Sequence, residues 1–484
     1  MAEPLTINGG RLYLPYMSES DHQGPWRHAF TDFHPRVREG LTVRSRRGLL
    51  KAGLAGMAGL SFTDLLRIRA AAAQEGRQMG SHKSVILLWM AGGPSHIDTW
   101  DPKPEAPIEV RGPFSSIPTK LPGVHLCEHY PKQAAMMDKL TLIRSMVCRG
   151  SNHQPNQVMQ TANPDCEPRT NPRAKNYPSI ASFVAKHHGP NDPHLPPSVA
   201  LNVKDSTHIA WGGYLGKRYD PFLGDKAAGL FKLPKGLTME RLESRRTLHQ
   251  QMDVMRSEID LTGSMEGLDA FGQQAFELIA GAKAQAAFDL SRESAKTIDR
   301  YGSHDWAKQA LLARRLVESG VSFVTIDLSN HSASGTWDTH GDNIPPYGGI
   351  SKGLKPLLPI FDHLFTTLVT DLEERGLLDE VLVIAMGEFG RTPTIGTQGS
   401  TDGRNHWPVV SSVMLAGGGF RHGQVIGSTE WDAGDVAERP VTPFDLAATI
   451  YHHFGIPLDT TYEDFTGRPN FMIMNGGRPI TELI

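Results

Sequence analysis

The segment WDTHGDN, residues 337–343, places metal-binding residue types at alternate positions. Asp338, His340 and Asp342 offer two carboxylates and one imidazole, which are common ligands of divalent cations. A polar loop explains the same residues, because Asp and Asn side chains bond to nearby backbone and Gly341 relieves the turn. Taken by itself the segment favours the loop, since short motifs often match by chance.

Two residues further along the chain can complete a metal site with Asp338 and His340. Glu388 follows an apolar run, and His406 lies in the segment GRNHWP. The four residues together offer two nitrogens and two or more oxygens from three loops. A ligand set of this kind, without thiolate, suits zinc, manganese, iron or calcium.

Each of these residues also has a structural interpretation. His340 suits an exposed loop, and His406 can pack against the indole of Trp407. Glu388 ends an apolar strand, where an unpaired carboxylate would be costly, so it needs a cation or a hydrogen-bond donor. Arg391 is a candidate ion-pair partner for it. Both interpretations stay open for each residue taken alone.

The segment AGGPSHIDTWD holds a second group of candidate ligands. The consecutive glycines Gly92–Gly93 permit a tight turn with positive φ, whose N–H groups can converge on an anion. His96 and Asp98 are candidates to bind the metal or to orient a ligand that does. The alternative is a strand-to-helix turn capped by Ser95.

The candidate catalytic groups lie in two other segments. RSMVCRGSNHQPNQVMQT places Ser151 and His153 at the start of a predicted helix. A serine at a helix N-terminus beside a metal is a candidate nucleophile, although serine at this position is more often simply the helix cap. Arg391, or the backbone of Gly92–Gly93, is a candidate to meet the negative charge that develops on a reacting ester.

The polar segments follow apolar runs that are typical of buried parallel strands. Val85–Met90 is one such run, and the patterns at 320–328 and 380–393 repeat it, with a fourth run at 409–419. Between the second and third runs, apolar residues recur at three- and four-residue spacing over 354–372, which predicts a helix and a parallel βαβ unit. In open α/β sheets ligands bind beyond the carboxyl ends of the strands, where these polar segments fall.

The 484 residues supply ample material for one large α/β domain, which we place at 80–484. Within it, residues 237–318 are charged and helical in pattern and predict a helical insertion or a layer beside the sheet. A formal net charge of −3 argues against a nucleic-acid partner.

The N-terminal residues 1–73 resemble a leader with a twin-arginine export signal. Arg46-Arg47 precede a weakly apolar, glycine-rich stretch, and an alanine run offers a cleavage site before Gln74. An amphipathic helix after a leader is the alternative. The apolar stretch is too short and too rich in glycine for a stable transmembrane span. The interpretation predicts a periplasmic or extracellular protein, and export in the folded state favours a metalloprotein.

The chain has three cysteines, Cys127, Cys148 and Cys166. At most one disulfide can form among them within the chain. The sequence contains no Cys-x-x-Cys pair that would indicate zinc binding or redox chemistry.

From residue 83 to about 470 the chain resembles the bacterial family catalogued as domain of unknown function 1501. GGPSHIDTWDPKP, WDTHGDN, GEFGRTP and GRNHWP are similar to the signature segments of that family, in the usual order and behind the usual leader. The family in turn resembles a remote branch of the alkaline phosphatase and sulfatase superfamily. That resemblance implies an alkaline-phosphatase-like three-layer α/β sandwich with a central, mostly parallel sheet and metals at its carboxyl edge.

Carried over to this sequence, the resemblance implies one metal site at Asp338, His340 and His406 and a second at Glu388. Several superfamily features differ here. Met90-Ala91-Gly92 replaces the usual Asp after the first strand, and Asp98 and Asp101 are candidates to substitute for it. Phe389 stands in the place of a histidine, the Asp–His spacing around residue 338 is shorter than usual, and the Cys-x-Pro-x-Arg segment of formylglycine sulfatases is absent.

Three functional hypotheses follow. The first is an exported hydrolase that uses a divalent cation, zinc, manganese or calcium, to cleave phosphate or sulfate esters of small molecules or polysaccharides. The second is a non-catalytic relative that keeps the fold and acts as a binding or assembly partner at the cell surface. The third is a metal site with other chemistry on an exported polysaccharide or cell-wall component.

Overall fold

The computed structural model describes residues 82–148, 156–167, 170–226, 281–332, 335–341, 343, 345–396 and 399–484. These residues all belong to one compact unit, Ser81–Ile484. Several sequence-based predictions fall outside the described residues: the leader 1–73, the cleavage site before Gln74, Ser151, His153, Asp342 and part of the helical insertion, 237–280.

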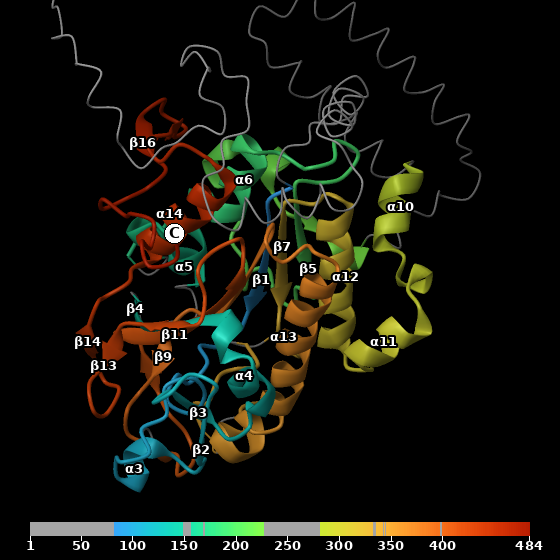
Figure 1. Ribbon diagram of the computed structural model, residues 1–484. Helices are drawn as coiled ribbons and strands as arrows, with labels where there is room; N and C mark the ends of the chain where they lie inside the picture. Colours follow the sequence, from blue (N-terminus) through green and yellow to red (C-terminus); the bar gives the residue numbers. More distant parts are fainter. Residues whose placement is uncertain are drawn as a thin grey trace, which may run out of the picture. The chain divides into compact units, whose positions relative to one another are not determined.

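An eight-stranded sheet lies at the centre of the described chain (Figure 1), in the order β12-β4-β11-β8-β1-β7-β5-β6. Within this sheet β11 alone runs antiparallel to both of its neighbours, and all other pairs are parallel. The strands are β1 (Ser84–Trp89), β4 (Leu140–Val147), β5 (Ser198–Leu201), β6 (Phe222–Leu223), β7 (Phe323–Asp327), β8 (Val381–Met386), β11 (Val410–Gly417) and β12 (Gln424–Ile426). The structure confirms the predicted central, mostly parallel sheet.

The apolar runs of the sequence became the central strands because these strands have no solvent-facing side. Every residue of β1, β7, β8 and β11 is buried. The sequence of a parallel strand that is covered on both faces is a continuous apolar run rather than an alternation of apolar and polar residues. β1 lies between β7 and β8, with Trp89 level with Asp327 and with Met386. The carboxyl ends of the three strands therefore meet at one edge.

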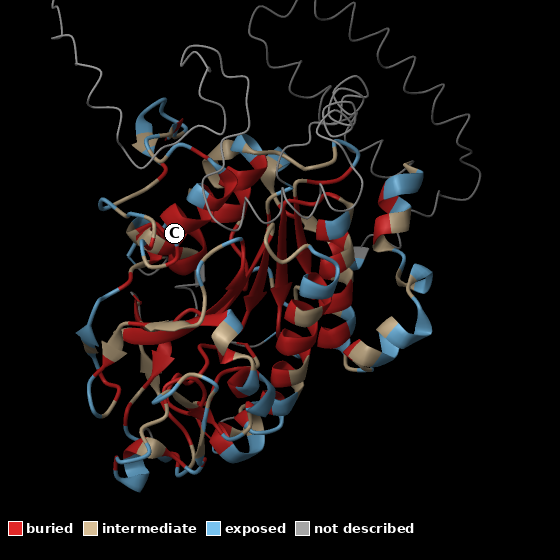
Figure 2. Cartoon of the chain, in the orientation of Figure 1, coloured by how far each residue is buried: buried red, intermediate tan, exposed pale blue. Residues whose placement is uncertain are grey.

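Helices cover both faces of the sheet, and each face has its own hydrophobic core. Ile86 and Leu88 of β1 face a core shared with α4, α12 and α13, whereas Val85 and Leu87 face a core shared with α6 and α14. Figure 2 shows these inner surfaces as buried and the outer sides of the helices as exposed. The longer helices are α6 (Ile180–His187), α12 (Asp305–Ser319), α13 (Leu357–Glu374) and α14 (Pro443–Phe454). This arrangement is the predicted three-layer sandwich.

The predicted helix between the second and third strands is α13, so that prediction is confirmed. β7, α13 and β8 follow one another in the chain and the two strands are parallel, but β1 lies between them in the sheet. The described part of residues 237–318 is also helical. It comprises α10 (Ala282–Phe288), the 3-10 turn η8 (Leu290–Arg292), α11 (Ala295–Tyr301) and α12.

Short elements complete the described chain. Two-stranded sheets pair β2 (Ser116–Pro118) with β3 (His125–Cys127), β9 (Gly390–Arg391) with β10 (His406–Trp407), β13 (Ser428–Thr429) with β14 (Val436–Glu438) and β15 (Thr461–Glu463) with β16 (Pro469–Phe471). The short helices are α3 (Ile108–Arg111), α4 (Pro131–Ala135), α5 (Asn156–Thr161) and η9 (Gly349–Leu354), with 3-10 turns at η2 (Met137–Lys139), η3 (Pro164–Cys166), η4 (Ala174–Asn176), η5 (Gly213–Leu215), η6 (Lys217–Tyr219) and η7 (Gly224–Lys226).

The three cysteines are free and buried. Burial raises the pKa of the Cys127 thiol and that of the Cys166 thiol to about 12. Burial, reinforced by the nearby charge of Glu388, also raises the pKa of Cys148. All three side chains therefore remain thiols at neutral pH and act as small apolar groups.

Candidate metal centre

Three side chains from two distant segments meet beyond the carboxyl ends of β1 and β8. Asp338 and His340 come from the loop after β7, and His406 begins β10. Each offers one ligand atom, and these atoms all lie within 4.8 Å of one another. Asp338 is buried, whereas His340 and His406 are half-buried, so the cluster has a buried floor and a more accessible side.

The two histidine rings are in direct contact, with 4.2 Å between their centroids. The ring of Phe389 lies 4.6 Å from that of His406, and the ring of Tyr347 lies 5.7 Å from that of His340. These aromatic neighbours restrict where the imidazoles can turn. Restricted ligands are pre-positioned and lose little conformational freedom when they bind.

Asp338 is held by donors that converge on one of its oxygens. Its Oδ1 lies 2.8 Å from Nη2 of Arg391 and accepts the backbone N–H of His340 at 3.0 Å. Nδ1 of His340 contacts the same oxygen. The side chains of Asp338 and Arg391 have no solvent exposure, so their attraction is little screened by water.

Arg391 uses its guanidinium within the protein. Its Nε donates to the carbonyl of Gly93 at 2.8 Å, Nη1 to the carbonyl of Arg404 at 3.2 Å, and Nη2 also donates to the carbonyl of Gly92. The sequence offered Arg391 as the group that meets charge on an ester. In the structure it orients Asp338 and fixes the loop after β1.

The Gly92–Gly93 turn has the positive φ values that its sequence predicts, +118° and +68°. A Cβ at Gly92 would lie 2.5 Å from the backbone nitrogen of Asp338, so only glycine lets the two loops approach this closely. The N–H of Gly92 donates to Oε1 of Glu388 at 2.9 Å. The anion that this turn meets is therefore a carboxylate of the protein itself.

Glu388 lies at the same edge of the sheet, where β8 ends, and it is buried. Its bond to Gly92 places it beside the loop that carries Asp338, and it is not one of the three residues whose ligand atoms cluster. Its place in the structure is beside the candidate metal-ligand cluster.

His96 and Asp98, the other predicted ligands, make separate buried contacts. Nε2 of His96 bonds to the carbonyl of Ala433 at 2.9 Å, and its Nδ1 accepts the backbone N–H of Arg391 at 3.4 Å. Both ring nitrogens are thus used, and burial lowers the pKa of His96 and favours the neutral ring. We leave His96 out of the metal centre.

Asp98 forms a two-pronged ion pair with Arg404, with distances of 2.7 and 3.1 Å. Both side chains are fully shielded from solvent. The backbone N–H of Arg404 donates to the carbonyl of Thr339 at 2.8 Å. Arg404 therefore links Asp98 to the loop between Asp338 and His340, and Asp98 lies outside the three-residue cluster in a supporting position.

The sequence-based reasoning missed a second polar cluster at this edge. Asp327 ends β7 without solvent exposure, and its Oδ2 lies 2.8 Å from Nδ1 of His208. His331, four residues after Asp327, has a pKa lowered by burial and by the charge of His208, an effect that Asp338 and Asp327 oppose. One feature of the sequence could have revealed this cluster: an aspartate at the end of an apolar run, followed four residues later by a histidine.

Comparison with known proteins identifies the family of this chain. Residues 82–484 match the family described as Protein of unknown function (DUF1501). The chain belongs to this family. A search of curated proteins finds no relative that matches the sequence.

The DUF1501 chain also has distant likenesses among solved structures. They include the PsFucS1 sulfatase from Pseudoalteromonas sp., at 13% identity, TM-score 0.38 and coverage of 81% of this chain and 70% of that one. The phosphonate monoester hydrolase SpPMH from Silicibacter pomeroyi has 11% identity, TM-score 0.35 and coverage of 82% and 75%. The zinc complex of the C-terminal periplasmic domain of EcEptC from Escherichia coli has 11% identity, TM-score 0.34 and coverage of 78% and 83%.

Proposed function

We propose that this DUF1501 protein is an exported, metal-dependent hydrolase of phosphate or sulfate esters. The observation that carries the proposal is the cluster of Asp338, His340 and His406, whose ligand atoms lie within 4.8 Å of one another. One carboxylate and two imidazoles form a donor set that suits zinc or manganese, and it recurs in catalytic sites that keep a position open. The resemblance of the sequence motifs to the alkaline phosphatase and sulfatase superfamily supports the choice of esters.

Each residue of the cluster, and Arg391 beside it, would have a distinct role in the proposed reaction. Asp338, His340 and His406 would hold the cation, and Arg391 would keep Asp338 in place through their 2.8 Å contact. A bound divalent cation polarises the ester oxygen and lowers the pKa of an attacking hydroxyl or water. The half-buried histidines leave the cluster accessible from one side, where a small-molecule or polysaccharide ester would approach.

Export is the second part of the proposal. It rests on Arg46-Arg47 and the apolar stretch behind them, which are sequence features. Among the residues that the structure describes, no helix combines the length and apolarity needed to cross a membrane. We propose a periplasmic or extracellular location.

A non-catalytic binding or assembly role is the second candidate. One observation favours it. The guanidinium of Arg391 makes its contacts within the protein, to Asp338, Gly92, Gly93 and Arg404. These contacts stabilise the fold. An enzyme of this class needs a group that meets the developing negative charge. Under this hypothesis the metal cluster would stabilise a docking surface.

Metal content separates the two candidates. We would purify the exported protein and measure metals by elemental mass spectrometry in the parent and in Asp338→Ala/His406→Ala. A matched control is Asp299→Ala/His452→Ala, which removes the same residue types at exposed positions. Bound metal that is lost only in the first variant, together with hydrolysis of phosphate or sulfate esters that is also lost, supports the enzyme. A folded parent without metal or ester hydrolysis refutes it.

A further inference from the structure

An open pocket lies beside the metal cluster and has no role in the function proposed so far. Its volume is about 590 Å³, within the range of about 300–1,000 Å³ that is typical of small-molecule sites. All but one of the described residues around it are apolar, and the exception is Asp435. The lining consists of Val147, Cys148, Pro408, Val409, Asp435, Val436, Ala437 and Pro440.

The chain itself places one wall of the pocket at the metal cluster. Pro408 follows His406, a member of the cluster, by two positions. Consecutive Cα atoms are about 3.8 Å apart, so the Cα atoms of these two residues are at most about 7.6 Å apart. The segment 408–409 therefore joins the pocket directly to the metal cluster.

A close approach of two strands holds the same wall beside Phe389, whose ring lies 4.6 Å from that of His406. The next residue, Gly390, leaves no room for a side chain, because a Cβ there would lie 2.2 Å from the carbonyl oxygen of Val410. Val410 directly follows the lining residue Val409. The pocket and the metal cluster thus share the backbone where β9 and β11 begin.

A second wall lies where β4 ends, at Val147 and the buried Cys148. Burial, and after it the charge of Glu388, raises the pKa of the Cys148 thiol. A charge has such an effect only at short distance. Since Glu388 accepts the N–H of Gly92 at 2.9 Å, this wall also lies at the edge of the sheet that carries the metal cluster.

The third wall consists of β14 and Pro440, and hydrogen bonds attach it to β4. Val441, directly after Pro440, accepts the backbone N–H of Val147 at 2.7 Å and donates its own N–H to the carbonyl of Ser145 at 2.9 Å. β13 and β14 accordingly lie beside β4 (Figure 1).

The turn between β13 and β14 is also fastened to residues near the cluster. The indole of Trp407, the neighbour of His406, donates to the carbonyl of Gly434, directly before Asp435. Nε2 of His96 bonds to the carbonyl of Ala433 at 2.9 Å. The three walls are therefore held in place around a space that opens next to His406.

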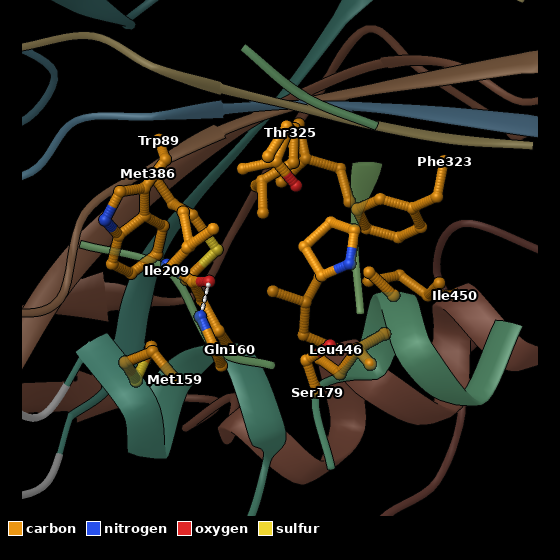
Figure 3. A pocket seen from close by; sticks show the side chains of 17 residues that line it. Trp89, Met159, Gln160, Ser179, Ile209, Phe323, Thr325, Met386, Leu446 and Ile450 are labelled. Atoms are coloured by element: carbon orange, nitrogen blue, oxygen red, sulfur yellow. Dashed lines mark hydrogen bonds between the residues drawn. The ribbon is translucent and has the colours of Figure 1, made fainter. Parts of the chain in front are cut away.

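A second cavity, shown in Figure 3, is too small to receive a substrate. It lies between the sheet and α5, α6 and α14, and Trp89, Ile209 and Phe323 are among the residues around it. Its volume is about 30 Å³, and a single water needs roughly 10–15 Å³ on this scale. The open pocket beside His406 is large enough to receive part of an ester.

The lining indicates which kind of group the pocket accepts. Val147, Pro408, Val409 and Val436 are half-buried, so an apolar group that covered them would remove further apolar surface from water. A sugar ring would find few polar partners for its hydroxyl groups among the described lining residues. The exposed carboxylate of Asp435 disfavours a second negative charge at the far end of a ligand.

We propose that this pocket binds the alcohol part of the ester, and that the preferred substrates are phosphate or sulfate monoesters of apolar alkyl or aryl alcohols. This inference rests on the function proposed above. The phosphate or sulfate group would lie at the metal cluster, while the apolar part extends over Pro408 and Val409. Polysaccharide esters would be poor substrates.

Binding of analogues without an ester bond tests the pocket separately from catalysis. We would load the protein with zinc and measure the affinities of methyl- and hexylphosphonate, and of methane- and hexanesulfonate, by isothermal titration calorimetry. Full burial of one CH₂ group raises affinity by about fourfold. We expect the hexyl compound to bind roughly 10- to 100-fold more tightly than its methyl counterpart, because its chain is partly buried.

Ala437→Asp adds a charge to the lining at an exposed position of β14. A charge beside an alkyl chain makes burial of that chain unfavourable, so the ratio of hexyl to methyl affinity should fall by about tenfold or more. The matched control is Ala295→Asp. Ala295 is also exposed and begins α11, which packs against α12 and α13, and its ratio should equal that of the parent.

Each other outcome contradicts the inference. Equal affinity of the parent for the methyl and hexyl compounds would show that the pocket binds no apolar group, and would leave the proposed function intact. A ratio that Ala437→Asp retains, or that Ala295→Asp loses equally, would place the alkyl chain elsewhere. If Ala437→Asp does not fold, Val436→Thr decides, because it keeps the size of the side chain, and a retained ratio overturns the inference. Binding of neither pair would refute an anion-binding metal centre, and the proposed function would fail together with this inference.

Discussion

Nη2 of Arg391 lies 2.8 Å from Oδ1 of Asp338, and neither side chain is exposed to solvent. The arginine therefore compensates the charge of the one buried carboxylate in the metal cluster. Removal of one partner from a buried ion pair leaves an uncompensated charge and typically costs roughly 3–5 kcal/mol. The pair explains how the carboxyl group of Asp338 can be buried beneath two half-buried histidines.

Replacement of Arg391 by methionine should destabilise the protein by roughly 3–5 kcal/mol, because Asp338 would lose its buried partner. A cation bound at the cluster would supply the missing positive charge. We therefore expect the loss to be smaller in the presence of zinc than in the presence of a chelator. Urea unfolding under both conditions measures the difference. Arg421→Met, at an exposed position, is the control, and an equal effect in the two variants would contradict the explanation.

Asp98→Asn distinguishes an anchor from a ligand. The substitution removes the charge that Arg404 pairs with at 2.7 and 3.1 Å in a fully buried setting. We expect a loss of roughly 3–5 kcal/mol in the free energy of unfolding with no loss of bound metal. Elemental mass spectrometry on the folded variant measures the second part. If Asp98→Asn loses an equivalent of metal that other equally destabilised variants retain, Asp98 is a metal ligand and the interpretation as an anchor is wrong.

Gly92→Ala tests the contact between the loop after β1 and the loop that carries Asp338. The new Cβ would lie 2.5 Å from the backbone nitrogen of Asp338, so the loop that carries Asp338 must move. Gly123→Ala is the matched control, because Gly123 also has positive φ, +76°, and its Cβ would meet no atom within 4 Å. The control should lose about 1–2 kcal/mol from backbone strain alone. We expect a larger loss and weaker metal binding in Gly92→Ala only.

The pH dependence of stability should report His453 of α14. Burial, followed by the charge of Lys83, lowers the pKa of His453 from 6.5 to about 4. Between these two values the unfolded chain binds a proton that the folded protein does not. The free energy of unfolding therefore falls as the pH drops from 6.5 to about 4, by roughly 3 kcal/mol in total.

Urea unfolding of the parent and of His453→Gln, at about pH 7 and about pH 4.5, measures this contribution. The variant should lose less stability than the parent on acidification, because its side chain does not titrate. Other buried histidines contribute to both proteins equally, so the comparison isolates His453. Identical pH dependence in the two proteins would show that the residue is not responsible.

Local pattern was sufficient to predict the framework of the fold. The runs at 85–90, 320–328 and 380–393 became β1, β7 and β8, and the apolar repeat at 354–372 became α13. These predictions succeeded because a strand or helix buried on one or both faces must carry its apolar residues at a fixed period. The order of the strands in the sheet could not be predicted from this local pattern. β1 lies between β7 and β8 because it pairs with strands that are distant in the chain.

The site was predictable in part for the same reason. The alternation in WDTHGDN and the position of GRNHWP named Asp338, His340 and His406, which the structure brings together. The sequence could not distinguish them from His96, Asp98 and Arg391, which belong to the same motifs. Only the folded chain shows that His96 uses both ring nitrogens and that Asp98 pairs with Arg404.

By itself the sequence determined which segments are strands and which loops are rich in polar residues, because periodicity and composition are local properties. The tertiary structure decided which polar residues share a site. His208 and Asp327 are 119 positions apart, and Arg391 and Asp338 are 53 apart (391 minus 338), yet each pair is in direct contact. Short-range electrostatics and hydrogen bonding act over a few ångströms in space, and distances along a sequence do not record them.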